Sequence, residues 1–126
     1  MERIIKFRAK DKFTNKWVYG DLVHNQKITE TGLEKRTMVG GYEVVEKTVG
    51  QFTGLKDKNG NDIYEGDLLS YRLEIELLVI FKHGSFGFYD KTLDMYIVSN
   101  LLAKKSNLIN MVEVIGNIYD NTELIK

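Results

Sequence analysis

The chain contains no cysteine and no proline. Without cysteine there is no disulfide, no thiolate nucleophile and no cysteine-ligated zinc site. Because proline is absent, the turns have to be built by glycine, asparagine and aspartate, which tolerate positive φ. The longest uninterrupted apolar run, Leu77–Phe81, is far too short to span a membrane.

A net charge is also lacking, since 18 Lys and Arg residues balance 18 Asp and Glu residues. This balance argues against a strongly basic, non-specific nucleic-acid binder, which needs many uncompensated cations. Apolar residues make up 43% of the 126 residues and charged residues 29%, as in soluble globular proteins. The first residues, MERIIKFRAKDKF, lack the apolar core of a signal peptide. We therefore expect a cytoplasmic protein.

The N-terminal part predicts a β-hairpin. Arg3–Lys10 alternates, so that its apolar residues, such as Ile5, are expected on the inner face and its basic residues, such as Arg8, on the outer face. Lys16–Val23 is rich in aromatic and β-branched residues. Asp11–Asn15 between them has turn composition. The following segment, His24–Gly41, is the least patterned and is predicted to be loop-like and available to an interface. The alternative is that it holds a short strand around Ile28 and another around Thr37–Val39.

The stretch Val49–Leu69 organises the remainder of the chain. It contains one predicted strand, an Asn-Gly pair that favours a tight hairpin turn with positive φ at both residues, and a second predicted strand. Ile75–Phe81 is apolar at nearly every position, which predicts a strand buried on both faces. Further strands are predicted over Phe86–Tyr89, Met95–Val98 and Asn110–Tyr119, with a helical turn over Asn100–Asn107.

Short strands with frequent turns predict a mainly β protein with little helix. We expect a small SH3-like β-barrel over residues 47–126. Residues 1–46 would form an appended N-terminal β-hairpin lobe with an irregular segment. Such a lobe is too small to bury its own apolar face, so it needs a partner surface.

The acidic residues of the central stretch are candidates for a metal or catalytic site. A calcium loop starting at Asp57 fails, because its sixth position is Asp62 instead of glycine and its twelfth is Leu68 instead of glutamate. Asp62, Glu65 and Asp67 have no His or Lys constellation beside them, and Glu65 or Asp67 is better explained as capping turn amides.

The two histidines and one glycine-containing segment are the remaining candidates for a catalytic, metal or phosphate-binding site. His24 and His83 each sit beside a predicted turn, where a solvated histidine is ordinary. Gly84–Phe88 matches neither a phosphate loop nor a dinucleotide fingerprint. We therefore predict no catalytic residue, no metal site, no cofactor and no enzymatic activity.

The best candidate for a binding surface is a basic and aromatic face on the N-terminal hairpin. Cations track phosphates, and aromatic rings stack on unpaired bases. The alternative is a solvated strand face with aromatic residues in the core. The candidate residues are Lys6, Arg8, Lys10, Trp17 and Tyr19.

Three segments resemble the YopX family of small phage and prophage proteins: Ile5–Val23, Thr48–Leu69 and Glu113–Ile125. The residues that carry the resemblance as a structural motif are Gly50, Gln51, Gly54, Asn59, Gly60, Tyr64, Glu65, Gly66, Asp67, Gly116 and Asn117. One departure is at Val44–Lys47, where the family tends to have a proline-containing turn.

The resemblance implies a β-rich protein with an SH3-like C-terminal part and no established catalytic residues. We expect a phage- or prophage-derived accessory protein that binds phage or host proteins, or copies of itself as a homo-oligomer. A nucleic-acid-binding protein that uses the N-terminal basic face is the alternative. No membrane association is expected.

Overall fold

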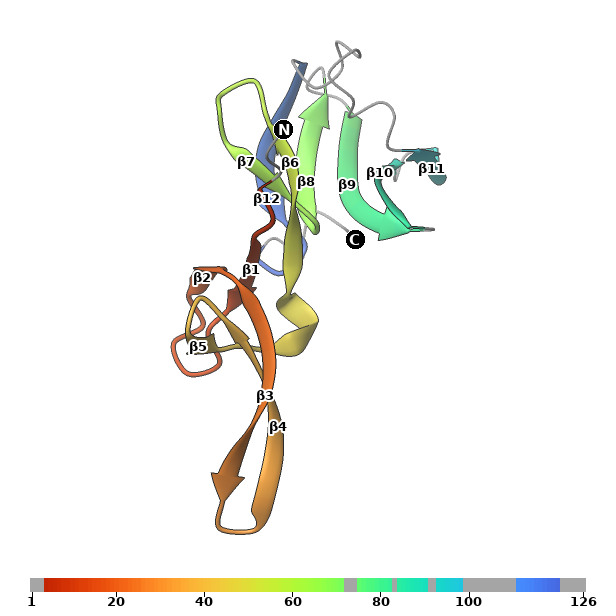
Figure 1. Cartoon of the computed structure of the whole chain (residues 1–126). Coiled ribbons are helices and arrows are strands. Elements are labelled where there is room, and N and C mark those ends of the chain that lie inside the picture. The colour runs from red at the N-terminus through yellow and green to blue at the C-terminus, as the bar shows by residue number, and fades with distance from the viewer. Residues whose placement is uncertain (1–3, 72–74, 83, 91–92, 99–110, 121–126) are drawn as a thin grey trace. The chain divides into compact units, whose positions relative to one another are not determined.

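The computed structural model describes residues 4–71, 75–82, 84–90, 93–98 and 111–120. The chain divides into two compact units, residues 1–52 and 53–126. The elements of the first unit (Figure 1) are β1 (Phe7–Lys10), β2 (Trp17–Gly20), β3 (Leu22–Thr29), β4 (Gly32–Val39), β5 (Tyr42–Glu43), the 3₁₀ helix η1 (Glu46–Thr48) and the start of β6 (Gly50–Lys56).

The predicted N-terminal hairpin is present as the antiparallel pair β1–β2, with Phe7 opposite Gly20 and Lys10 opposite Trp17. Its loop is organised by Asp11, whose Oδ1 accepts hydrogen bonds from the N–H groups of Phe13 and Thr14 at 2.8 and 3.1 Å. The predicted second strand is divided at Gly20, where φ is +146°, so that β3 starts a new sheet.

The segment after β2 is not a loop, and the alternative of short strands around Ile28 and Thr37–Val39 is closer to the structure. β3 and β4 form a regular antiparallel hairpin whose register runs from Leu22 opposite Val39 to Thr29 opposite Gly32. Figure 1 shows this hairpin as a long twisted ribbon. Most of its side chains are exposed on both faces, and therefore the sequence has no alternation of apolar and polar residues to reveal the strands.

Two glycines allow a close backbone approach within the first unit. A Cβ atom on Gly40 would lie 2.3 Å from the carbonyl oxygen of Tyr19, and one on Gly20 would lie 2.7 Å from the Cα of Gly40. The N–H of Gly40 donates to the carbonyl of Asp21 at 3.1 Å. This contact joins the end of β2 to the turn between β4 and β5.

The core of the first unit is small. It is formed by three buried side chains from three elements: Ala9, Val39 and Val44. Half-buried apolar side chains pack around them, namely Phe7, Val18, Leu22 and Val49. Ile5, expected on the same inward face of β1 as Phe7 and Ala9, is instead exposed.

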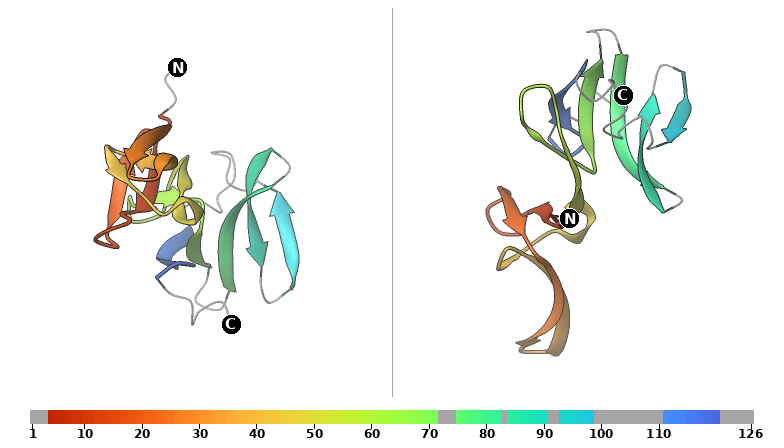
Figure 2. Two further views of the ribbon diagram at one scale, coloured as in Figure 1. Left: turned by 90° about the horizontal axis from the view of Figure 1, so that it is seen from below. Right: turned by 45° about the horizontal axis from the view of Figure 1, so that its top comes forward.

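The second unit contains the end of β6, β7 (Asp62–Tyr64), β8 (Asp67–Tyr71), β9 (Ile75–Lys82), β10 (Ser85–Asp90), β11 (Met95–Val98) and β12 (Val112–Asn117). Five strands form one antiparallel sheet in the order β11-β10-β9-β8-β12. In Figures 1 and 2 the blue strand β12 lies beside the green strand β8, although the two are far apart in sequence.

Large side chains fill the core of the second unit. The buried members are Ile63, Leu69, Leu77, Val79, Phe88 and Val112. β9 is the strand predicted from the apolar run, but it is buried on one face only. Leu77 and Val79 face the core, while Leu78 and Ile80 on the other face are half-buried.

The fold is mainly β, with three antiparallel sheets and one 3₁₀ turn among the described residues. The sheets do not close into a barrel within that part of the chain. No helix of the described residues is long and apolar enough to cross a membrane. The helical turn predicted over Asn100–Asn107 lies outside the described residues.

Candidate functional site

The basic and aromatic residues of the predicted binding face lie on one side of the first unit. The register places Arg8 opposite Tyr19 and Lys10 opposite Trp17, so the cations and the aromatic rings share a face. On the other side of β1, Arg8 lies opposite Gly50 of β6. Further along β6, the N–H of Phe52 donates to the carbonyl of Lys6, which places another aromatic residue beside the basic ones. The five residues that the sequence singled out are therefore brought together.

Each cation of this face lies against an aromatic ring. The Nζ of Lys6 is 4.6 Å from the centre of the Phe52 ring, and the Cζ of Arg8 is 4.7 Å from that of Trp17. The Nζ of Lys10 is 5.5 Å from the same Trp17 ring. These distances are within cation–π range. The rings of Phe52 and Trp17 are thus already in contact with cations of their own unit.

Arg8 differs from the expectation for a solvated strand face, because only 7% of it is exposed. Tyr19, in contrast, is 56% exposed. Alternation in the sequence assigned Arg8 to the wet side of β1, but the Trp17 ring lies over it. The nucleic-acid role of this face remains a prediction.

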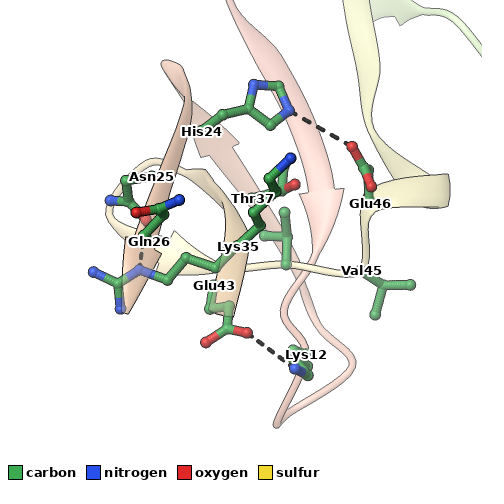
Figure 3. Close-up of a pocket in the computed structure, with 11 residues that line it drawn as sticks. Lys12, His24, Asn25, Gln26, Lys35, Thr37, Glu43, Val45 and Glu46 are labelled. Atoms are coloured by element: carbon green, nitrogen blue, oxygen red, sulfur yellow. Dashed lines mark hydrogen bonds and ion pairs between the residues drawn. The ribbon is translucent and has the colours of Figure 1, made fainter. Parts of the chain in front are cut away.

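A second feature of the first unit is a groove of about 690 Å³. One wall comes from the middle of the β3–β4 hairpin and the other from residues 43–46, with Lys12 at one end (Figure 3). Of the predicted candidates, only His24 lies here. The groove residues are Lys12, His24, Asn25, Gln26, Lys35, Arg36, Thr37, Glu43, Val44, Val45 and Glu46.

Glu43 is held by two lysines. Its Oε2 accepts a hydrogen bond from Lys12 at 3.0 Å, and its Oε1 accepts one from Lys27 at 2.8 Å. The hydrogen bonds from Lys27 and then Lys12 lower the pKa of Glu43 below its ordinary value of 4.5. Two positive charges therefore compensate one carboxylate at this end of the groove.

The other charged or titratable side chains that line the groove are His24, Lys35, Arg36 and Glu46. Figure 3 shows His24 pointing toward Glu46, with 3.7 Å between Nε2 and Oε1. Arg36 donates from Nε to Oδ1 of Asn25 at 2.6 Å, which leaves its positive charge without a carboxylate. Lys35 is exposed. In the described part of the chain, neither Arg36 nor Lys35 forms an ion pair.

The tip of the β3–β4 hairpin is apolar and open. Ile28 lies directly opposite Leu33, and the two side chains are 87% and 66% exposed. Directly opposite side chains on one face of an antiparallel pair touch each other. Both apolar residues can be read from the sequence, but their pairing was not predicted because the register of the hairpin was not predicted.

The carboxylates of the central stretch have structural roles. Asp57 is 6% exposed, and its Oδ1 accepts hydrogen bonds from the N–H groups of Asn59 and Asn61. Its Oδ2 accepts from the N–H of Val114 in β12 at 2.9 Å. Burial opposes the charge, but these N–H donors outweigh it and lower the pKa of Asp57 below 3.8.

The turn that Asp57 organises differs from the two-residue turn expected at Asn59-Gly60. Only Gly60 has a positive φ, of +84°. The N–H of Gly60 donates to the carbonyl of Asp57, and the N–H of Asp57 donates to the carbonyl of Asn61. A longer loop with one left-handed residue therefore joins β6 to β7, since the Asp57 carboxylate supplies the acceptors.

Asp67 is 1% exposed and accepts a hydrogen bond from the N–H of Tyr64 at 2.7 Å, which caps the turn at Glu65-Gly66. Gly66 has a φ of +92°. Asp62 lies 3.8 Å from the Nζ of Lys56. Among the described residues, no three His, Asp or Glu side chains gather as a metal site. His83 lies outside those residues.

The remaining motif residues mark bends. Gly50 and Gln51 pair with β1, and Gly54 has a φ of +89° within β6. The register shifts between Val114 and Gly116, which makes a bulge in β12. Asn117 then accepts hydrogen bonds at Oδ1 from the N–H groups of Tyr119 and Asp120, each at 2.9 Å.

Comparison with known proteins identifies a similar solved structure and a matching family. The crystal structure of protein EF1440 from Enterococcus faecalis is similar, with a TM-score of 0.57 and 26% identity over 99% of this chain and 100% of that chain. No curated protein matches. The sequence profile of the YopX protein matches residues 6–126, which is nearly the whole chain. The chain therefore belongs to the YopX family.

Proposed function

We propose that this chain is a non-enzymatic accessory protein of phage or prophage origin that associates with copies of itself. The observation that carries the proposal is the exposed pair Ile28–Leu33 at the tip of the β3–β4 hairpin. A two-stranded hairpin is only marginally stable by itself in water. Covering this tip removes apolar area from water, at about 25 cal/mol per Å².

The charges of the two units support self-association. Residues 1–52 contain ten Lys and Arg against seven Asp and Glu, while residues 53–126 contain eight against eleven. The chain is neutral as a whole, but its first unit is basic and its second is acidic. Opposite charges on two units of one chain favour the encounter of two copies and fix their orientation.

The strand order of the second unit supports the assignment of an SH3-like fold to this part of the chain. In β11-β10-β9-β8-β12, four consecutive strands form a meander and the last strand returns beside the first. This is the strand order of an SH3-like barrel, and we propose that the second unit derives from one. SH3-like domains bind other proteins in many unrelated contexts, so the fold alone does not specify the partner.

Light scattering coupled to size exclusion, over a range of protein concentrations, tests the self-association. We expect the mass of the wild type to rise with concentration, and the double variant Ile28→Ser/Leu33→Ser to stay monomeric. Phe13→Ser is the matched control, since Phe13 is 75% exposed in the β1–β2 loop, away from the hairpin tip. A wild type that is monomeric throughout, or a double variant that associates like the wild type, would reject the proposal.

Nucleic-acid binding is the alternative from the sequence. It is supported by the position of Lys6, Arg8 and Lys10 on one face with Trp17 and Tyr19. It is weakened by the contacts that the Trp17 ring already makes with Arg8 and Lys10. Filter binding of single- and double-stranded DNA at two salt concentrations tests it, because phosphate contacts make binding salt-dependent.

A further inference from the structure

One edge of β4 is open along half of the strand. β3 pairs with the whole of its other edge, from Gly32 to Val39. On the second edge, β5 pairs only with Met38 and Val39, and the N–H of Val44 donates to the carbonyl of Thr37 at 2.9 Å. In the described residues no strand continues this pairing toward Gly32.

The backbone groups on that edge follow from strand geometry. In a strand, the N–H and C=O of one residue point to the same edge, and alternate residues point to alternate edges. Since the carbonyl of Thr37 faces the β5 side, the N–H and C=O groups of Lys35 and Leu33 also face it. These groups are free to pair with an added strand.

The groove lies beside this edge. Its wall contains Lys35, Arg36 and Thr37, and residues 43–46 form the other side. A volume of about 690 Å³ is within the range of peptide- and ligand-binding clefts, roughly 300–1,000 Å³. An added strand rises about 3.3 Å per residue, so the space suits a short extended segment.

The charges around the groove select the side chains of such a segment. Glu43 is compensated by Lys12 and Lys27, whereas Lys35 and Arg36 have no carboxylate partner in the described part of the chain. A Lys or Arg side chain next to a strand edge attracts a carboxylate on the added strand. A basic segment would instead bring its charges next to those of Lys35 and Arg36.

From the open edge and the unpaired cations beside it, we propose that the groove binds an extended peptide segment with acidic side chains, which adds as a strand to β4 at Leu33–Lys35. Backbone hydrogen bonds provide the affinity. Lys35 and Arg36 are consecutive in β4 and project to opposite faces of the sheet, so each attracts the acidic side chains on its own face of the added strand. This site is independent of the exposed tip residue Ile28, whose side chain is not part of the groove.

Fluorescence anisotropy with a dye-labelled seven-residue peptide of alternating Glu and Val tests the proposal. We expect saturable binding that weakens as salt is added. The same peptide with Lys in place of Glu, and a peptide methylated at alternate backbone nitrogens, should bind at least about ten times more weakly. Equal binding of the Glu and Lys peptides, or of the methylated and unmodified Glu peptides, would overturn the proposal.

Variants separate the two parts of the site. Lys35→Ala removes the cation, and Lys35→Pro also removes the N–H on the open edge without touching the pairing with β3. We expect Lys35→Ala to weaken Glu-peptide binding several-fold and Lys35→Pro to weaken it further. The control Lys16→Ala removes an exposed lysine outside the groove and should bind like the wild type. Equal loss in Lys16→Ala and Lys35→Ala would reject the site.

A second copy of the chain is the competing occupant. Peptide binding is therefore measured in Ile28→Ser, in which the tip is altered and the groove is intact. Unchanged affinity supports the peptide groove even if the self-association fails its own test. If instead a rising concentration of unlabelled protein prevents peptide binding, a copy of the chain occupies the groove and the proposal is overturned.

Discussion

The two units of this chain are stabilised in different ways. The core cluster of the first contains three modest side chains, Ala9, Val39 and Val44, and the unit leaves Phe13, Ile28 and Leu33 more than half exposed. The core cluster of the second contains six side chains, among them Phe88 and Ile63. The second unit can therefore be understood as a folding core. The first exposes apolar and charged side chains, and both proposed binding surfaces, the hairpin tip and the groove, lie there.

The largest expected effect tests the difference in cores. Phe88→Ala should lower the free energy of unfolding by about 3–5 kcal/mol, because it leaves a cavity among large side chains. Val39→Ala in the smaller core removes less volume and should cost about 2 kcal/mol. Urea denaturation followed by circular dichroism measures both. Equal losses would show that the two cores contribute alike.

The next effect concerns how the first unit holds its sheets together. Gly40→Ala should cost about 2–4 kcal/mol, because its Cβ would lie 2.3 Å from the carbonyl oxygen of Tyr19 and φ is +60°. Gly41→Ala is the control. Its φ is +89° but nothing lies within 4 Å of the added Cβ, so strain alone costs about 1 kcal/mol. Fluorescence of Trp17, the single tryptophan, reports on this unit. Equal losses of unfolding free energy in Gly40→Ala and Gly41→Ala would contradict the close contact between Gly40 and Tyr19.

The smallest expected effect tests whether the charged carboxylate of Asp57 stabilises the second unit. Asp57→Ala should cost about 1–3 kcal/mol near neutral pH, since it leaves the partly buried N–H of Val114 without its acceptor. Because the folded pKa of Asp57 is lowered, its contribution is present above pH 3.8 and is lost as the pH falls through the lowered value. The stability gap between wild type and variant should therefore narrow in acid. A gap that is independent of pH would mean that the charge of Asp57 contributes nothing.

The parts of the fold that the sequence predicted are those in which local signals agree with packing. The β1–β2 hairpin, the apolar strand β9 and the turn near Asn59-Gly60 each have such a signal. The β3–β4 hairpin was missed because both of its faces are exposed. Arg8 was assigned to solvent because alternation along a strand predicts only which face a side chain takes. It does not predict that the Trp17 ring lies against the Arg8 guanidinium.

The candidate site divides in the same way. The basic and aromatic residues of β1 and β2 were recognised as a surface, and the register does place them on one face. The groove could not be predicted, because it depends on β5 ending after Glu43 and leaving the edge of β4 open. A strand that ends early has no signature in composition.

The hydrogen bond between Asp57 and Val114 also has a consequence for synthesis on the ribosome. The residues that pair within the first unit have all emerged once residue 52 is out, so their pairing can begin while the remainder of the chain is still being made. The Asp57 carboxylate and the outer edge of β8 must wait for β12, which is translated near the end. Ribosome-arrested chains ending before residue 111 should therefore contain a protected first unit and a protease-sensitive second one.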